Sequence, residues 1–308
     1  MSDSKAGAAK RGGAMYGLGM FGALVYCWHL ADSFWEYRLS IFQGIFLAAF
    51  MLYEVFETPH RLNEGRGGVS MHDHVSGIEV PAPVGRYIET AYPDGVPGVD
   101  TAAMEGSGRF RQRPLPWLPF TNIIWLRPGV DRVSDMFVRL GPITVMKVLD
   151  AYVDGRGITK FLNRADTGPR VDQGAMHPML CESLMFPSCW SRTPGFAWEP
   201  VDADTARVHT PFEAGFEVAS VGFDPDTGFP ATFETMRFKG KDGPKVRWRI
   251  TMLGWRRFGV VTIPERMMVR WADEPGPWLE LRFERVTIGV DLDEPLTRAR
   301  TAIATASA

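Results

Sequence analysis

The stretch at residues 181–190, CESLMFPSCW, holds the strongest candidate for a catalytic residue, because the acid Glu182 stands among apolar side chains. Burial raises the pKa of a carboxyl group and can turn it into a general acid or base. Asp154 and Arg156, on the turn sequence DGRG, are the candidate partners of Glu182. The alternative, which we favour, is a structural ion pair in which Glu182 and an arginine join a helix to a sheet.

The same stretch contains two of the three cysteines of the chain, Cys181 and Cys189. No histidine or third cysteine lies near them to complete a zinc site, so we interpret both as small buried hydrophobic residues. His72 and His74, in MHDH, would face one side of an extended segment and could share a metal, but no third ligand follows at a useful spacing. We therefore expect no metal and no cofactor, and we allow only for a bound lipid.

Motifs and charge argue against several classes of protein. The sequence contains no G-x-S-x-G nucleophile motif and no phosphate-binding P-loop. The formal net charge of −2 gives no overall positive field, so we expect no nucleic-acid partner. A non-catalytic protein is our preferred expectation.

Two apolar segments near the N-terminus predict a transmembrane helical hairpin at residues 12–58. The first, residues 12–30, has no Asp, Glu, Lys or Arg, and the second, residues 40–56, has only one. A spanning helix needs roughly 20 apolar residues. A cleaved signal peptide and a pair of buried soluble helices are the alternatives, which the missing cleavage pattern and the near-absence of charge disfavour.

The first apolar segment also offers contacts for partner helices. Gly13, Gly17 and Gly22 would be poor choices in a soluble helix but let membrane helices approach closely. His29 is a candidate contact to a partner helix or an axial ligand to a haem or chlorophyll-type pigment, since ionisable groups in membranes are often functional. Its alternative role is to reach the interface from the end of the segment.

Basic residues predict how the hairpin is oriented. They flank it on both outer sides, whereas the loop between the two helices has only Arg38 against two acids. The positive-inside rule then predicts a multi-pass protein of the inner (cytoplasmic) membrane, with the lipid bilayer as partner and the soluble domain on the cytoplasmic side. The predicted parts are a cytoplasmic tail at 1–11, the hairpin at 12–58, a linker at 59–83, a β domain at 84–296 and a disordered tail at 297–308.

Apolar and polar residues alternate with a period of two from about residue 105 to 290, which predicts strands with one wet face. In VRWRITM, residues 246–252, the apolar side chains fall on one face and the arginines on the other. The turn sequences DPDTG at 224–228 and GKDGP at 240–244 predict hairpins. The fold class is therefore α+β, mainly β: a large curved antiparallel sheet, a half-barrel, with one or two packed helices after the transmembrane hairpin.

Two helices interrupt or precede this pattern. One is predicted at residues 84–91, between Pro83 and a Pro-Asp-Gly turn. The other is predicted at residues 172–187, where apolar residues recur at helical spacing, with Pro178 in the first turn and Pro187 at the end.

The order of these pieces resembles a bacterial family of membrane-associated proteins of unknown function, over about residues 84–290. The most specific pieces are AYVDGRG at 151–157, the E-x-x-x-F-P pattern at 182–187 and IPE at 263–265. That family in turn resembles in fold the lipoprotein-carrier (LolA-like) domains, in which a curved antiparallel sheet lidded by helices takes acyl chains. The resemblance implies a half-barrel and a lipid-like ligand, but no catalytic residues. The cytoplasmic orientation departs from the carrier domains.

A curved sheet with one bulky apolar face must cover that face with helices, a ligand, a membrane or a partner. We therefore expect a membrane-anchored, non-catalytic binding protein that holds a lipid or other long apolar molecule in a cavity of more than roughly 300 Å³ between sheet and helix. Its candidate ligand-binding residues are Met176, Met179, Leu180, Leu184, Trp248 and Trp255. One alternative is an accessory subunit of a larger integral membrane complex, respiratory or photosynthetic. Another is a hydrolase or isomerase that uses Glu182.

Overall fold

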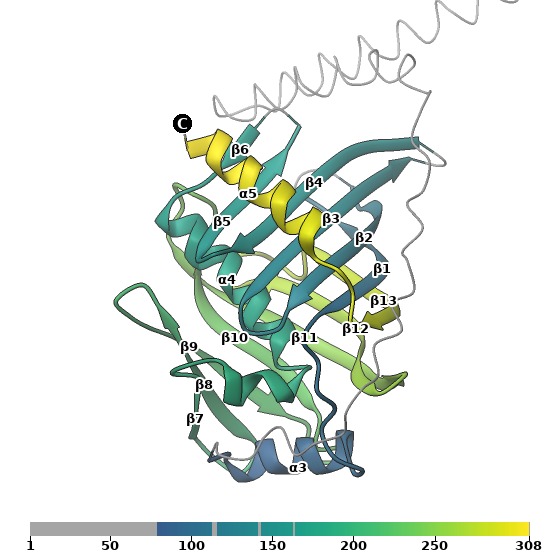
Figure 1. Ribbon diagram of the computed structural model, residues 1–308, viewed down its shortest axis with the longest axis vertical. Helices are drawn as coiled ribbons and strands as arrows, with labels where there is room; N and C mark the ends of the chain where they lie inside the picture. The colour runs from purple at the N-terminus through teal and green to yellow at the C-terminus, as the bar shows by residue number, and fades with distance from the viewer. Residues whose placement is uncertain (1–78, 113–115, 141–142, 163, 308) are drawn as a thin grey trace, which may run out of the picture. The chain divides into compact units, whose positions relative to one another are not determined.

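The computed structural model describes residues 79–112, 116–140, 143–162 and 164–307, and these belong to one compact unit (Figure 1). The predicted transmembrane hairpin lies outside the described residues, together with Gly13, Gly17, Gly22 and His29. His72 and His74 lie outside them as well. Within the described part, no helix has both the length and the apolar character that crossing a membrane requires.

One antiparallel sheet of thirteen strands forms the body of the described unit. The strands run in the order β6-β5-β4-β3-β2-β1-β13-β12-β11-β10-β9-β8-β7, so the first and last strands in the chain pair at the centre. The strands are β1 (Ala102–Phe110), β2 (Leu118–Arg127), β3 (Asp131–Leu140), β4 (Ile143–Val153), β5 (Arg156–Phe161), β6 (Arg164–Asp166), β7 (Ala197–Pro200), β8 (Thr205–Phe212), β9 (Gly215–Phe223), β10 (Pro230–Phe238), β11 (Lys245–Phe258), β12 (Val261–Trp271) and β13 (Leu279–Ile288). The prediction of a large antiparallel, mainly β domain is confirmed.

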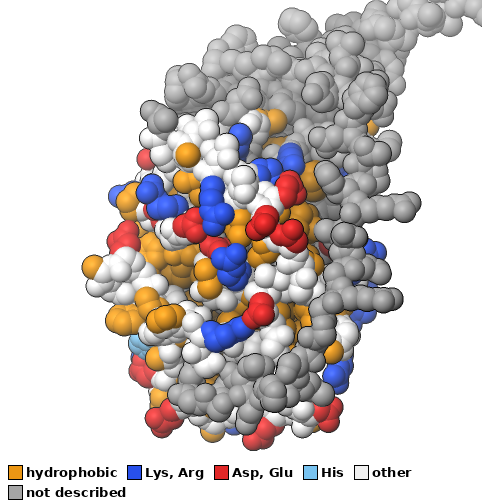
Figure 2. Space-filling model, viewed as in Figure 1, with side chains coloured by type: hydrophobic (Ala, Val, Ile, Leu, Met, Phe, Trp, Pro, Cys, Tyr) orange, Lys and Arg blue, Asp and Glu red, His pale blue; other side chains and the backbone are white. Residues whose placement is uncertain are grey.

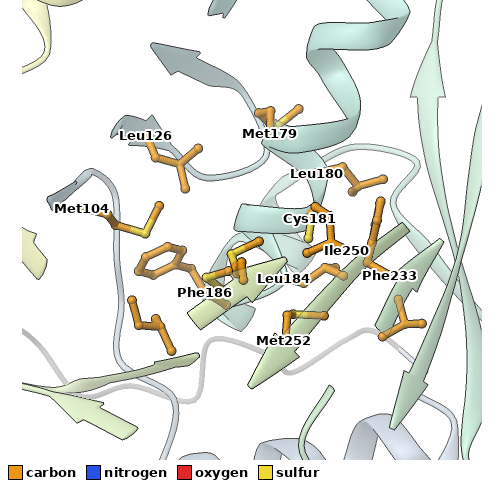
Figure 3. Close-up of a cluster of buried hydrophobic side chains, with 14 of the residues drawn as sticks. Met104, Leu126, Met179, Leu180, Cys181, Leu184, Phe186, Phe233, Ile250 and Met252 are labelled. Atoms are coloured by element: carbon orange, nitrogen blue, oxygen red, sulfur yellow. The ribbon is translucent and has the colours of Figure 1, made fainter. Parts of the chain in front are cut away.

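The helix α4 (Pro169–Ser183) and the 3-10 helix η2 (Pro187–Arg192) cover the inner face of this sheet. The sheet has two limbs, β1–β6 and β7–β13, which meet at the pairing of β1 with β13. Every residue of α4 from Val171 onward is buried, because the helix packs against β4 and β5 of the first limb and against β10 of the second. Figure 3 shows Leu180, Cys181 and Leu184 close to side chains of β10 and β11. The short helix α3 (Ala82–Ala91) packs on the same core through Tyr87. The inner face is therefore filled by the chain itself.

The C-terminal residues form a helix, α5 (Asp293–Ser307), which crosses the outer face of β3 and β4 (Figure 1). Leu292, Leu296 and Ala299 form a buried stripe against Val133 and Ala151. The prediction of a disordered tail at 297–308 is therefore wrong. Apolar residues at helical spacing continue to Ala306, and packing of this face on the sheet stabilises the helix.

The predicted helix at 172–187 also differs from the structure. α4 begins at Pro169, which occupies the first helical turn, and Pro178 lies inside the helix and not in its first turn. The helix ends before Pro187, which instead opens η2. The helix predicted at 84–91 is present as α3, starting two residues earlier.

Candidate functional site

Two adjoining hollows lie where the two limbs of the sheet face each other, between the β4–β5 turn and the β8–β9 hairpin, with the first turn of α4 between them. Their volumes are about 500 and about 420 Å³, and we call them hollow 1 and hollow 2, and together the groove. Pro169, Phe212 and Glu213 line both hollows. Apolar walls come from Tyr152, Pro169, Pro211, Phe212, Phe216 and Phe238.

Hollow 1 contains an ion pair between two neighbouring elements. Asp172, in the first turn of α4, accepts a hydrogen bond of 2.6 Å from the backbone N–H of Gly157 and lies 3.4 Å from the guanidinium of Arg156. Burial raises the pKa of Asp172, although the Gly157 N–H and Arg156 act against this. Any side chain at position 157 would collide with the backbone of α4 at Val171, so glycine permits this close approach.

In hollow 2, two cationic side chains lie near one aromatic ring. The charged ends of Arg170, from α4, and Lys245, from β11, each lie 5.2 Å from the centre of the Phe238 ring. Lys245 also pairs with Glu217 at 3.0 Å. Arg170 donates a hydrogen bond of 3.3 Å to the carbonyl of Gly243, and it forms no ion pair with a carboxylate among the described residues.

Behind hollow 2 lies a fully buried histidine. His177 Nε2 is 3.1 Å from the hydroxyl of Thr235 and 3.6 Å from the carboxylate of Glu217, while its Nδ1 has no hydrogen-bond partner within the described part of the chain. Burial lowers the pKa of His177. Burial alone would raise the pKa of Glu217, but its hydrogen bonds with His177 and Lys245 lower that pKa to about 2. The cluster holds a charged carboxylate at the wall of hollow 2.

Glu182 lies in a buried ion pair away from both hollows. Its Oε2 accepts a hydrogen bond of 2.8 Å from Arg132 Nε, and Arg132 Nη1 donates to Asp150 at 2.8 Å. Burial raises the pKa of Glu182, against the opposing effect of Arg132. The structural alternative, an arginine that joins the helix to the sheet, is what the structure contains: Arg132 connects β3 to α4.

The predicted partners of Glu182 lie elsewhere. Asp154 sits in the β4–β5 turn with a φ of 51° and pairs with Arg300 of α5, and Arg156 pairs with Asp172. The structure therefore brings neither of them to Glu182. It does place Arg156 in hollow 1.

The candidate ligand-binding residues are placed together, but in the core. Met176, Met179, Leu180, Leu184 and Trp248 are buried against one another and their neighbours on the inner face. The sixth, Trp255, is partly buried, stacks on Phe229 and donates its indole N–H to the Pro230 carbonyl at 2.8 Å. Both hollows lie beside the β8–β9 hairpin and the first turn of α4, and none of these six residues lines them.

Sequence reasoning missed most of the groove. Arg170 lies in the first turn of α4 and Phe212 at the end of β8, whereas Phe238 and Lys245 are partners across the β10–β11 hairpin. The hairpin predicted at 240–244 pairs the last two, but only the fold brings them to Arg170 and Phe212. His177 is the one residue with a local signal, because a histidine within an apolar helix pattern must find a partner or remain uncharged.

Comparisons with known proteins place this chain in a family context. A family model described as "Family of unknown function (DUF6544)" matches residues 71–283. None of the curated proteins matches the chain.

The chain is also similar to three crystal structures, each at low sequence identity. A LolA superfamily protein from Nitrosomonas europaea is 8% identical, with a TM-score of 0.42, covering 70% of this chain and 97% of its own. A DUF1329 family protein from Desulfovibrio piger is 12% identical, with a TM-score of 0.41, covering 70% and 96%. A domain described as an outer membrane lipoprotein-sorting protein, from Vibrio parahaemolyticus, is 11% identical, with a TM-score of 0.39, covering 65% and 90%.

Proposed function

Since this chain belongs to the DUF6544 family of unknown function, we propose its function from its own geometry. The protein is a non-catalytic binding protein that holds a lipid or other long apolar molecule in the groove between the two limbs of its half-barrel. The predicted N-terminal hairpin anchors it in the inner membrane, with the described domain on the cytoplasmic side and close to a source of such molecules.

The observation that carries this proposal is the aromatic and proline lining of the groove. Hollows of about 500 and 420 Å³ are in the usual size range of ligand sites. The ligand is assigned to the groove and not to the interior, because α4 and η2 already fill the inner face with buried side chains. A long chain would run from one hollow to the other across Phe212, which lines both.

Titration of the full chain, purified in an uncharged detergent, with decanol tests this proposal. Decanol has an apolar chain and no charge, so its binding reports the groove's apolar walls alone. We expect saturable binding that Phe212→Ala weakens about tenfold, because burial of a phenylalanine ring against the ligand is lost. Phe258→Ala is the matched control, since Phe258 is a partly buried phenylalanine at the far end of β11.

Two outcomes would overturn the proposal. Absence of decanol binding by the wild-type chain would remove the binding function itself. Equal weakening by Phe212→Ala and Phe258→Ala would show that the molecule does not lie in the groove.

A second candidate function, an accessory subunit of a membrane complex, is favoured by one surface. Val218 and Met236 are 38 and 47% exposed on the neighbouring strands β9 and β10, and Phe216, which also lines hollow 2, is 63% exposed beside them. Figure 2 shows hydrophobic side chains gathered over the protruding β8–β9 hairpin. Extraction in a gentle detergent followed by a native gel tests it, and migration as a lone monomer would argue against it.

The hydrolase or isomerase alternative gains no support in the described part of the chain. Glu182 is bound to Arg132, and it lines neither hollow.

A further inference from the structure

We propose that hollow 2 binds an anionic head group, the carboxylate or phosphate of a long-chain amphiphile, through Arg170 and Lys245. The inference rests on the proposed function, because it names the chemical class of the molecule whose apolar part lies in the groove. It assigns Arg170 as the residue that distinguishes a charged ligand from an uncharged one.

The first step is the convergence of two positive charges. Arg170 comes from the first turn of α4 and Lys245 from the start of β11, yet each lies 5.2 Å from the centre of the Phe238 ring. Both side chains line hollow 2, so an anion held in the hollow would be attracted by two groups of opposite charge. A guanidinium also binds carboxylate and phosphate groups through two parallel hydrogen bonds.

The second step is the state of each cation. Lys245 is balanced by Glu217, which also contacts His177 and whose pKa of about 2 keeps it charged. Arg170 contacts only the Gly243 carbonyl and the Phe238 ring among its described polar and aromatic contacts. It is exposed, so its guanidinium is open to a ligand. Arg170 is therefore the group whose charge a ligand would neutralise.

The third step is the position of α4. Hollow 2 borders its first turn, and the residue before the helix, Gly168, provides no side chain to cap it. The N-terminal end of a helix carries partial positive charge, which adds to the attraction of the two side chains. Asp172 offsets this on the hollow 1 side, where it is engaged by Gly157 and Arg156.

Among the described residues that line hollow 2, the exposed Glu213 is the one acid without an ion pair. It lines both hollows, and the described residues include no ion pair between it and Arg170. The proposal therefore predicts opposite effects for the two charges: loss of Arg170 weakens anion binding, and loss of Glu213 strengthens it. A role of these residues in shape alone predicts no such pairing of signs.

The experiment compares decanoate with decanol on the full chain in an uncharged detergent. We expect the wild-type chain to bind decanoate about tenfold more tightly than decanol, as charge-assisted hydrogen bonds would give. Arg170→Gln should abolish this preference and Arg170→Lys should keep most of it. Glu213→Gln should increase it. The preference is measured in each variant as the ratio of decanoate to decanol affinity, so a change in the shape of the groove alone would shift both affinities and leave the ratio unchanged. Arg256→Gln is the matched control, since Arg256 is an exposed arginine 4.3 Å from the Phe258 ring at the other end of β11.

Each other outcome overturns a defined part of the argument. Equal binding of decanoate and decanol removes the head-group inference and leaves the proposed function intact, whereas binding of neither removes both. Inorganic phosphate that displaces decanoate at a similar concentration would assign the site to a free anion and overturn the amphiphile. A preference that survives in Arg170→Gln would show that this arginine does not read the head group.

Discussion

The two ends of α4 lie in opposite surroundings, although they belong to one helix of 15 residues. At the C-terminal end, Glu182 is 5% exposed and is paired with Arg132. At the N-terminal end, Arg170 is exposed at the rim of hollow 2 and has no carboxylate partner within the described residues. At the sealed end, the ion pair of Glu182 with Arg132 joins the helix to the sheet. At the open end, Arg170 keeps an exposed guanidinium, which is the charge that we propose a head group binds.

Removal of Arg132 is the strongest way to break the sealed end. Arg132→Met leaves two carboxylates, Glu182 and Asp150, without their shared cation in a buried site. Breaking a buried pair on one side costs about 3–5 kcal/mol of folding free energy, which urea denaturation followed by tryptophan fluorescence would measure. Arg300→Met is the control, because it breaks the exposed pair with Asp154 and should change the unfolding midpoint little. Similar losses in both variants would contradict the contrast.

A pair of truncations sharpens the contrast between core and groove. Leu180 is 2% exposed in the core, so Leu180→Ala should cost about 2–5 kcal/mol of stability. The folded fraction of this variant should still bind decanol with wild-type affinity. Phe212→Ala should show the reverse, a smaller loss of stability and a loss of affinity. Weakened decanol binding in Leu180→Ala, measured well below its melting temperature, would return the ligand to the interior.

The sheet and the core can be predicted from the sequence far better than the groove can. In β11, alternation alone assigns Trp248, Ile250 and Met252 to one face, and the structure buries all three on the inner face. Period-two patterning is local, so a single strand reveals it. The groove joins the β4–β5 turn, the first turn of α4 and the β8–β9 hairpin, and their meeting depends on how the two limbs of the sheet come together, which no local pattern encodes.

The sequence predicts buried polar groups in part: it indicates that such a group needs a partner, but not which residue the partner is. The apolar surroundings of Glu182 indicate that an arginine must balance it, but the pairing with Arg132 spans 50 residues and follows only from the fold. The predicted position of Pro178, in the first turn of the helix, is wrong for a similar reason: what surrounds this proline is known only from the fold. A proline within a helix leaves one carbonyl without its helical partner, and in α4 Arg237 of β10 donates a hydrogen bond to that carbonyl, of Gly174.

The pH dependence of stability tests the role of His177, which lies in the middle of α4 and behind hollow 2. Burial lowers the pKa of His177, so the unfolded chain binds its proton more readily than the folded one does. Its contribution is fully present above the ordinary pKa of about 6.5 and is lost as pH falls below it, by at most about 1.4 kcal/mol per pH unit. The neighbouring groups do not interfere in this range. Glu217, with its pKa of about 2, acts only below about pH 4.5, and Arg237, whose pKa burial lowers to about 10, stays charged in this range.

Replacement of the ring isolates this effect. His177→Gln cannot titrate, yet its amide can still contact Thr235 and Glu217. Its unfolding free energy should therefore fall less steeply than that of the wild type between pH 6.5 and 5, as urea denaturation at each pH would measure. Identical slopes would place the pH response in another group.

The smallest effect concerns the carbonyl that Pro178 leaves without its helical partner. Proline has no N–H, so the Gly174 carbonyl four residues earlier lacks the usual hydrogen bond. Arg237 Nε donates to it at 2.7 Å, while its guanidinium lies 4.6 and 5.5 Å from the centres of the Trp248 and Trp271 rings. In Pro178→Ala the helical N–H returns and competes for the carbonyl. Arg237→Met should then cost about 1 kcal/mol less in the Pro178→Ala background than in the wild type, measured as a double-mutant cycle in urea. Additive effects would mean that Arg237 acts through the two tryptophans alone and that the Gly174 carbonyl needs no partner from the sheet.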